Sequence, residues 1–377
     1  MCFISSYPPN RARLSEYAQN LVSALAELNS IESIYILADK THYAVKCREI
    51  NPKVKLHRVW RADSYFSVLN VLRYILQIKP DVVHFNISFQ SFGKSKLTNF
   101  CGLSLICLCR LFGFHVLAGV HTLADVADLT KYNVKPTIVN KIGIHVATKM
   151  ILSSQSVIVL VKAYGASLKE RYKHKGVHYI PHGTTVNAQS KIDSKDNVIL
   201  LFGHMGPHKG LPVLLEAFKK IRAQKADAKL IVAGTNHPNF PNYLQQFIEM
   251  NIPNVEYTGY VPQKDLAAIF RRAQVVVLPY HAAPGTSGVF HLACGYSRPI
   301  VASDLPEIRE LVKDGASAIL VCSGDSEALK NAILLLLNDP SIAAEMCEKN
   351  LKFALKESWG SVAKAYENAY LALVYKE

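Results

Sequence analysis

The stretch FGHMGPHKGLPVLLEAF occupies residues 202–218 and follows the apolar run NVILL, which is typical of a β-strand. It holds three glycines, among them Gly203, and the cation Lys209 before a helical pattern begins. Glycines let the backbone approach a ligand, and a helix start offers N–H groups and a positive dipole to an anion. Lys209 adds a full charge, and His204 adds a hydrogen-bond donor. On local features alone, the stretch fits an anion site and an ordinary strand–helix turn equally well.

Strand-like runs alternate with helical patterns on both sides of this stretch. The predicted strands cover 2–6, 34–38, 54–59, 81–86, 115–121, 156–161, 177–180, 197–203, 228–234, 255–260, 275–280, 299–303 and 318–321. The predicted helices cover 15–29, 67–79, 95–112, 135–153, 162–174, 209–224, 241–250, 263–272, 286–296, 306–313, 325–338, 340–356 and 359–375. Such alternation predicts parallel sheets with crossover helices. Two series in tandem predict two Rossmann-like, doubly wound α/β domains that face a cleft. The polar segment 186–197 is predicted as the linker between a domain at 1–185 and a domain at 198–358.

The composition indicates a globular protein with an uneven charge. Of its 377 residues, 50% are hydrophobic and 19% are charged, which excludes a disordered chain. Residues 1–190 hold 23 Lys and Arg against 10 Asp and Glu, whereas residues 191–377 hold 20 against 19. A basic first half suits an acidic partner, such as a phosphorylated substrate or an anionic membrane face, and also fits a merely solubilising surface. Nucleic acid is not expected as a partner, because no aromatic-rich basic motif accompanies the charge.

The cysteines and the apolar segments predict a cytoplasmic protein. The eight cysteines form no C-x-x-C pair and are interpreted as reduced core residues, not as a disulfide frame or a zinc site. The opening MCFISSYPPN lacks the features of a signal peptide. The most apolar window, 101–120, contains Arg110 and His115, so a buried helix and a strand are expected there rather than a membrane span. A helix that dips into the membrane interface stays open as the alternative.

A second group of candidate residues follows the strand that ends at Pro279. The loop of small residues leads to Gly285, Thr286, Ser287, Gly288 and Val289, where a helix is predicted to begin. Its N-terminal amides and two hydroxyl groups could bind phosphate oxygens. One diphosphate bridging this helix start and the turn at Lys209 fits the arrangement, because ligands of parallel sheets bind at the carboxyl ends of the strands.

Two further candidates lie in the first half of the chain. His121 ends a predicted strand in GVHTLADV, where a catalytic role and a structural role are equally compatible with the pattern. The turn SSYPPNRARLSEYAQNL at 5–21 places Arg11 and Arg13 where a second ligand could enter, and it also reads as a solvated loop.

Taken together, these segments resemble the retaining glycosyltransferases of family 4, which have the two-domain GT-B fold. The resemblance rests on FGHMGPHKGLPVLLEAF, YTGYVPQKDLAAIFRRAQVVVLPY, SGVFHLACGYSRPIVASDLPEIRELVKDG and YIPHGT, and it extends over essentially the whole chain. The terminal SWGSVAKAYENAY resembles the last helix of the family, which packs back on the first domain; here that helix would span 359–377.

The resemblance implies a role for each matching residue. Lys209 would bind the diphosphate of a nucleotide-diphosphate sugar, a UDP- or GDP-sugar, with Gly203 and His204 beside it. The backbone around Tyr260 and Val261 would meet the base, and His121 would lie beside the transferred sugar. The residues from Thr286 to Val289 would touch the phosphates. His204 stands where many members have arginine, and a neutral histidine is a weaker phosphate partner than a guanidinium group.

The chain also departs from the family pattern. Many members carry paired glutamates in the donor segment, where this chain has Pro284 and Leu292; it resembles instead a subgroup with a Ser-Gly-Val turn. Glu310 is the nearest remaining acid. A turn rich in glycine after the first strand is replaced by residues 11–13, Arg-Ala-Arg, which fits an anionic acceptor or an inactive descendant.

The resemblance therefore implies a retaining hexosyltransferase that requires no metal and no cofactor. Its partners would be a nucleotide sugar and a glycan or lipid-linked acceptor in polysaccharide or glycolipid synthesis. The charge of the first half, and not the resemblance, suits peripheral contact with an anionic membrane. Two other hypotheses stay open. One is another enzyme of the same fold, such as a sugar-nucleotide epimerase or a phosphorylase; the other is a non-catalytic protein that binds nucleotide or glycan.

Overall fold

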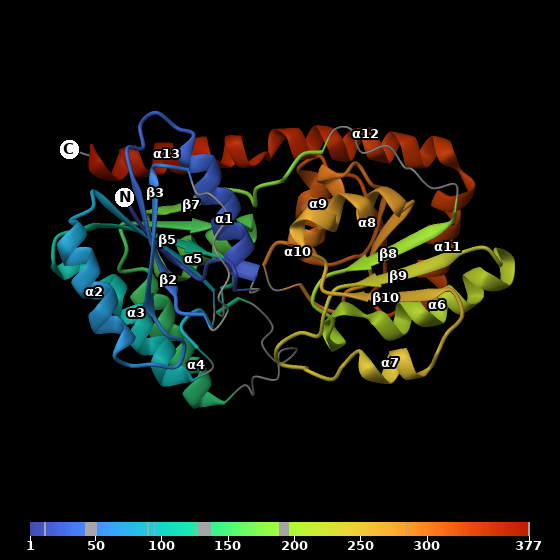
Figure 1. The fold of residues 1–377 in the computed structure, drawn as a ribbon, viewed down its shortest axis with the longest axis horizontal. Helices are drawn as coiled ribbons and strands as arrows, with labels where there is room; N and C mark the ends of the chain where they lie inside the picture. The colour runs from blue at the N-terminus through green and yellow to red at the C-terminus, as the bar shows by residue number, and fades with distance from the viewer. Residues whose placement is uncertain are drawn as a thin grey trace. The chain divides into compact units, whose positions relative to one another are not determined.

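A computed structural model describes residues 1–10, 13–41, 51–88, 90–93, 95–123, 125–126, 137–187, 196–283 and 285–375. Arg11 and Pro284, which entered the predictions above, lie outside these residues, and of Arg13 only the backbone is described. The chain divides into two compact units (Figure 1). The first comprises Met1–Gly183 with Trp359–Glu377, and the second comprises Thr184–Ser358.

The first unit is built on a parallel sheet of seven strands. Their order is β3 (Val54–Trp60), β2 (Ile34–Asp39), β1 (Cys2–Ser5), β4 (Val82–Ile87), β5 (His115–Val120), β6 (Ser156–Val159) and β7 (Val177–Tyr179). The central strands are nearly continuous buried apolar runs, as expected when helices cover both faces of a parallel sheet.

Two apolar cores lie on the two faces of this sheet. One core includes side chains of α2 (Ser67–Ile78), α3 (Lys96–Leu111), α4 (Ile138–Ile151) and α5 (Lys162–Tyr172). The other includes side chains of α1 (Arg13–Ala26) and α13 (Trp359–Val374), which pack against each other (Figure 1). The last helix of the chain thus completes the core of the first unit.

The second unit holds a parallel sheet of six strands with one continuous core. The strand order is β10 (Val255–Gly259), β9 (Lys229–Ala233), β8 (Val198–Phe202), β11 (Val275–Leu278), β12 (Ile300–Ser303) and β13 (Ile319–Val321). Its helices are α6 (Leu211–Gln224), α7 (Gln245–Glu249), α8 (Leu266–Arg272), α9 (Gly288–Gly295), α10 (Pro306–Lys313), α11 (Ser326–Asn338) and α12 (Pro340–Lys356). Short 3₁₀ turns precede α6 and α8, at Pro207–Lys209 and Gln263–Asp265.

The predicted fold class is confirmed, because both sheets are parallel and doubly wound. In each sheet the strand order runs outward in both directions from a central pair, β1 and β4 in the first unit and β8 and β11 in the second. The crossover direction reverses at this pair, and ligands of such sheets bind beyond the carboxyl ends of the strands there. A ligand of either unit is therefore expected to bind near the residues that follow these four strands.

Three details differ from the sequence expectations. The helix predicted from residue 209 begins at Leu211, because Lys209 closes a 3₁₀ turn and Gly210 takes a left-handed conformation between the two. The helix predicted at 241–250 is shorter, Gln245–Glu249. Among the cysteines, Cys322 is exposed, so the prediction of a core position is wrong for that residue.

The apolar window 101–120 forms the predicted buried helix and strand, α3 and β5. No helix within the described part of the chain combines the length and the apolar character needed to cross a bilayer.

Candidate active site

The turn after β8 and the loop after β11 lie side by side in the second unit. His281 donates its backbone N–H to the carbonyl of His208 at 2.9 Å. A Cβ atom added to Gly210 would stand 1.8 Å from the carbonyl oxygen of Pro279, so only glycine permits this approach. Gly210 also has a φ of +66°, a conformation that side chains disfavour. The structure thus joins the two segments that the sequence predicted as anion sites.

Lys209 is buried where these two segments meet. The residue is only 2% exposed, and its Nζ lies 3.7 Å from the centre of the Tyr280 ring. Nζ is also 4.0 Å from the place where a Cβ on Gly203 would be, and Val289 Cγ2 is 3.5 Å from that place. Lys209, Gly203 and Val289 therefore surround the carboxyl end of β8. The aromatic face beneath the ammonium offsets part of its desolvation.

The N-terminus of α9 supplies the second half of the candidate site. Ser287 is the N-cap residue, and its side chain accepts a hydrogen bond from the N–H of Phe290 at 3.3 Å. Gly288 and Val289 form the first turn, whose backbone N–H groups lack partners within the helix. The Oγ1 atom of Thr286 is buried and has no hydrogen-bond partner among the residues that the structure describes. A buried hydroxyl without a partner is costly, so a ligand oxygen at this position would stabilise it.

The remaining predicted residues of the second unit occupy separate elements. His204 is half-buried directly after Gly203. Tyr260, 38% exposed, and Val261, which packs against the core, follow β10 at the edge of the sheet. Glu310 is half-buried on α10, the helix after β12.

In the first unit, His121 is held by a chain of hydrogen bonds at the switch point. Its Nε2 lies 2.7 Å from Oδ1 of Asn86 in β4, and Nδ2 of Asn86 donates to Oγ of Ser5 at 2.9 Å. Because the amide oxygen can only accept, His121 carries a proton on Nε2. The edge of the His121 ring also meets Tyr17, with the ring centres 4.3 Å apart.

The layer behind His121 is rich in buried aromatic and imidazole groups. Tyr17 Oη lies 3.1 Å from Tyr366 Oη, and Nδ1 of His84 lies 2.6 Å from Tyr370 Oη. Burial, with a smaller contribution from the nearby charge of His121, lowers the pKa of His84 to about 3. Burial likewise raises the pKa of both Tyr366 and Tyr370 above the usual range. His84 is therefore neutral at physiological pH.

Asp125, the acid nearest to His121 in the sequence, is paired elsewhere. Its carboxylate binds Arg171 at 3.2 Å and accepts a hydrogen bond from Tyr172. Within the described part of the chain, no cluster of three or more His, Cys, Asp or Glu side chains could hold a metal ion.

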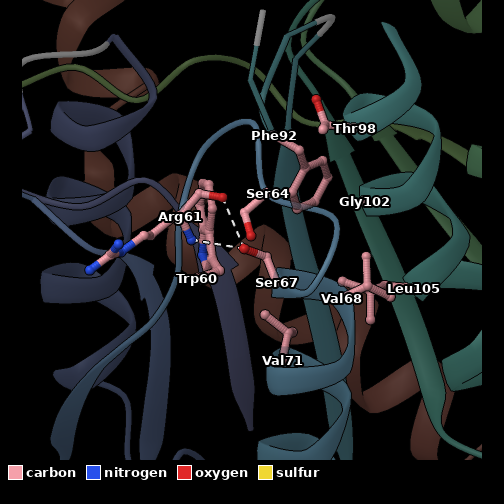
Figure 2. Close-up of a pocket in the computed structure, with 10 residues that line it drawn as sticks. All are labelled: Trp60, Arg61, Ser64, Ser67, Val68, Val71, Phe92, Thr98, Gly102 and Leu105. Carbon is pink, nitrogen blue, oxygen red and sulfur yellow. Dashed lines mark hydrogen bonds between the residues drawn. The ribbon is translucent and has the colours of Figure 1, made fainter. Parts of the chain in front are cut away.

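A small pocket in the first unit, between α2 and α3, contains none of the predicted residues (Figure 2). Its lining residues are Trp60, Arg61, Ser64, Ser67, Val68, Val71, Phe92, Thr98, Gly102 and Leu105. Figure 2 shows the Arg61 guanidinium pointing away from the other lining side chains, and Ser67 is hydrogen-bonded to the backbone of Arg61. Among the described residues, its lining includes no carboxylate and no imidazole.

The sequence reasoning missed several residues of these two sites. Asn86 and Tyr280 each stand at or just after the end of a strand, and a search for polar residues at such positions could have found them. His291 and Glu357, which form a buried pair behind Ser287, are 66 positions apart and carry no local signal.

The fold and the second unit define the class of protein. Two parallel-sheet units of this kind are the GT-B fold. The chain aligns over its full length with sucrose-phosphate synthase from Thermosynechococcus elongatus. The TM-score is 0.76, the sequence identity is 20%, and the alignment covers 99% of that chain. It also aligns with the Anabaena protein HepE, crystallised with UDP-glucose, at a TM-score of 0.71 and 13% identity, covering 97% of this chain and 98% of that one.

Residues 196–339 match the model of the family glycosyl transferases group 1. One curated relative, the phosphatidyl-myo-inositol mannosyltransferase of Mycobacterium leprae, is 26% identical over 51% of this chain and 52% of its own length. The chain spans about half the length of the curated relatives it matches.

Proposed function

We propose that the protein is a retaining glycosyltransferase that moves a sugar from a nucleotide-diphosphate sugar to a glycan or lipid-linked acceptor. The observation that carries the proposal is the burial of Lys209 between the turn after β8 and the loop before α9. A diphosphate bound at this place would meet the ammonium charge of Lys209 and the N–H groups at the start of α9 together. The match of residues 196–339 to the group 1 family model and the likeness to a fold that holds UDP-glucose in HepE support a donor of this class, a UDP- or GDP-sugar.

The proposed donor site places the diphosphate between Lys209 and the N-terminus of α9. The N–H groups of the Ser287–Gly288–Val289 turn and the Thr286 hydroxyl would bind its oxygens, with Gly203 leaving room for close approach. His204 would add a hydrogen bond. Tyr260 and Val261 would meet the base, and Glu310 would meet the sugar or ribose. In this proposal the Ser-Gly-Val turn binds the phosphates, and the contact that paired glutamates make with the sugar or ribose in other members is lost.

The proposed reaction breaks the bond between the anomeric carbon and the phosphate oxygen, and it forms a bond from that carbon to an acceptor hydroxyl oxygen. The electron pair of the broken bond stays on the nucleoside diphosphate, which takes up the acceptor's proton. Lys209 and the dipole of α9 would stabilise the developing negative charge without a metal ion. Attack on the face that the diphosphate leaves gives retention of configuration. His121, oriented by Asn86, would contact the sugar and position it.

Each of the two units would then bind one of the two substrates. The basic region 1–185 would bind the acceptor, and 198–358 would bind the donor. Residues 186–197 would link them, and 359–377 would anchor the chain's end on the first unit.

A thermal-shift screen tests the donor site. The protein and a Lys209→Ala variant are heated with UDP, GDP, ADP and their sugars, since a ligand that binds only the folded state raises the Tm with its occupancy. We expect a shift with one nucleotide class that is lost in the variant, followed by transfer of labelled sugar to an acceptor. Equal shifts in both proteins, or none in either, would contradict the assignment of Lys209. Binding without turnover would instead favour a non-catalytic binding protein.

A further inference from the structure

Seven large apolar side chains are exposed where α2, α3 and α4 begin. Their exposed fractions lie between 52% and 77%. We name this set the apolar patch; it comprises Tyr65, Phe66, Leu69, Leu97, Ile138, Val139 and Ile142. Single exposed apolar residues are ordinary, but a group of them marks an interaction surface.

Hydrogen bonds hold the three helix starts next to one another. Asp63, before α2, accepts from the N–H of Ser95 and from the hydroxyl of Thr98 at the start of α3. At the next junction, Lys96 Nζ donates to Oδ1 of Asn140 in α4 at 2.7 Å. The side chains of the apolar patch therefore lie on three neighbouring helices. Figure 1 shows these helices beside the first sheet.

The apolar patch lies at the functional edge of the first sheet. The three helices follow β3, β4 and β5, so their first turns stand at the carboxyl ends of these parallel strands. Asn86 in β4 and His121 directly after β5 lie at the same edge. A surface bound to the apolar patch would thus be close to the residues proposed to bind the sugar and its acceptor.

The charged side chains on the three helices have one sign, whereas Asp63, just before α2, is an exposed acid that hydrogen-bonds to Ser95 and Thr98. The three helices contain no Asp or Glu, but they contain Arg73, Lys96, Arg110, Lys141 and Lys149. Arg61, just before α2, is also exposed. The helix N-termini add partial positive charge at the apolar patch itself. A second copy of this chain is a poor occupant, because a twofold interface would bring these cations face to face.

We propose that the apolar patch is a membrane-docking surface for an anionic lipid bilayer. Its aromatic and aliphatic side chains enter the boundary between headgroups and acyl chains, and the neighbouring cations meet the lipid phosphates. The inference extends the proposed function, since a lipid-linked acceptor would lie in the same surface. Lipid binding can nevertheless be measured without donor, acceptor or turnover.

Vesicle flotation of the full chain tests this surface. Phosphatidylcholine vesicles with and without phosphatidylglycerol are compared at low and high salt for the wild type and for a Phe66→Ser, Ile138→Ser, Ile142→Ser variant. We expect the wild type to float with the anionic vesicles at low salt and less at high salt. The triple variant should bind them at least about tenfold more weakly. A matched control, Ile248→Ser with Met250→Ser, removes two exposed apolar side chains from the second unit and should float like the wild type.

Three results would overturn the proposal: no flotation of the wild type, unchanged flotation of the triple variant, or equal binding to neutral vesicles. A change in self-association by light scattering with unchanged flotation would identify the apolar patch as a contact between copies and also overturn it. The nucleotide thermal shift, measured on the same variants, separates the two proposals. Flotation without any nucleotide shift or sugar transfer contradicts only the proposed function, and a nucleotide shift without flotation contradicts only the docking surface.

Discussion

The imidazole of His291 bridges the carbonyl oxygen of Ser287 and the carboxyl group of Glu357. Nδ1 lies 2.9 Å from the carbonyl oxygen and Nε2 lies 3.2 Å from Oε2 of Glu357. The two side chains are 1% and 5% exposed. Since the carbonyl oxygen can only accept, Nδ1 donates to it, and a hydrogen bond between Nε2 and Oε2 needs one proton between these two atoms. This pair fixes the N-cap of α9 against the end of α12.

Breaking this pair should loosen the candidate donor site. A Glu357→Leu variant leaves His291 buried without its partner, which should reduce the free energy of unfolding by about 1–3 kcal/mol. Glu357→Gln is the matched control, because its amide can donate to Nε2 and should cost less than about 1 kcal/mol. Urea denaturation measures both. Equal losses for the two variants would show that shape, not the hydrogen bond, holds Ser287.

The neighbouring hydroxyls, Thr286 and Ser287, should respond differently to removal. Thr286→Val keeps the shape and removes an Oγ1 that has no partner among the described residues, so we expect an unchanged or higher Tm but about two- to tenfold weaker nucleotide binding. Ser287→Ala removes the N-cap of α9 and should cost about 1 kcal/mol of stability even without nucleotide. Thermal melts with and without nucleotide distinguish the two effects. A lower Tm for Thr286→Val in the absence of nucleotide would mean that its hydroxyl already has a structural partner.

Gly210 and Gly259 have nearly the same φ, so alanine substitutions at the two positions distinguish a steric clash from backbone strain. Gly210 and Gly259 have φ values of +66° and +67°, but only at Gly210 would a Cβ meet another atom, the Pro279 oxygen at 1.8 Å. Gly259→Ala should cost about 1–2 kcal/mol from the left-handed conformation. Gly210→Ala should cost at least about 2 kcal/mol more, because the turn after β8 must move away from the loop after β11. Similar denaturation midpoints would show that the two segments are not in close contact.

His84 should make stability depend on pH. Its pKa is about 3 in the folded protein, against 6.5 for an ordinary histidine side chain, so the unfolded chain takes up a proton that the folded chain does not. The stabilisation is present above pH 6.5 and is lost as the pH falls. Between pH 7 and pH 5, the free energy of unfolding should fall by about 2 kcal/mol more for the wild type than for a His84→Gln variant. The comparison cancels the other histidines, and parallel pH profiles would contradict burial of a neutral His84.

The sequence predicted the fold well because local patterns decide it. Apolar runs and helical periodicity located nearly every element, and α10 and α12 have the predicted bounds. The start of α6 was placed two residues early, because the left-handed Gly210 separates Lys209 from the helix. Backbone conformation at a glycine is not encoded in periodicity, so such a break appears only in the structure.

The candidate site was less predictable, because its supporting contacts join distant segments. Lys209 and Ser287 could be chosen from their positions after strands, but their roles remain proposals. Tyr280 beneath Lys209 and Glu357 behind Ser287 depend on how strands and helices pack. The exposed side chains of α4 are another example, since an apolar helix pattern does not reveal which apolar residues stay uncovered.

The position of α13 has a consequence for synthesis on the ribosome. Tyr366 and Tyr370, which cover His84 and Tyr17, are translated only after the entire second unit. Until they emerge, one face of the first sheet lacks part of its cover, although most of that sheet was made first. Synthesis of the first unit therefore begins early and is completed only after the second unit has been made. A nascent chain halted before residue 359 would present an apolar face to chaperones instead of a completed domain.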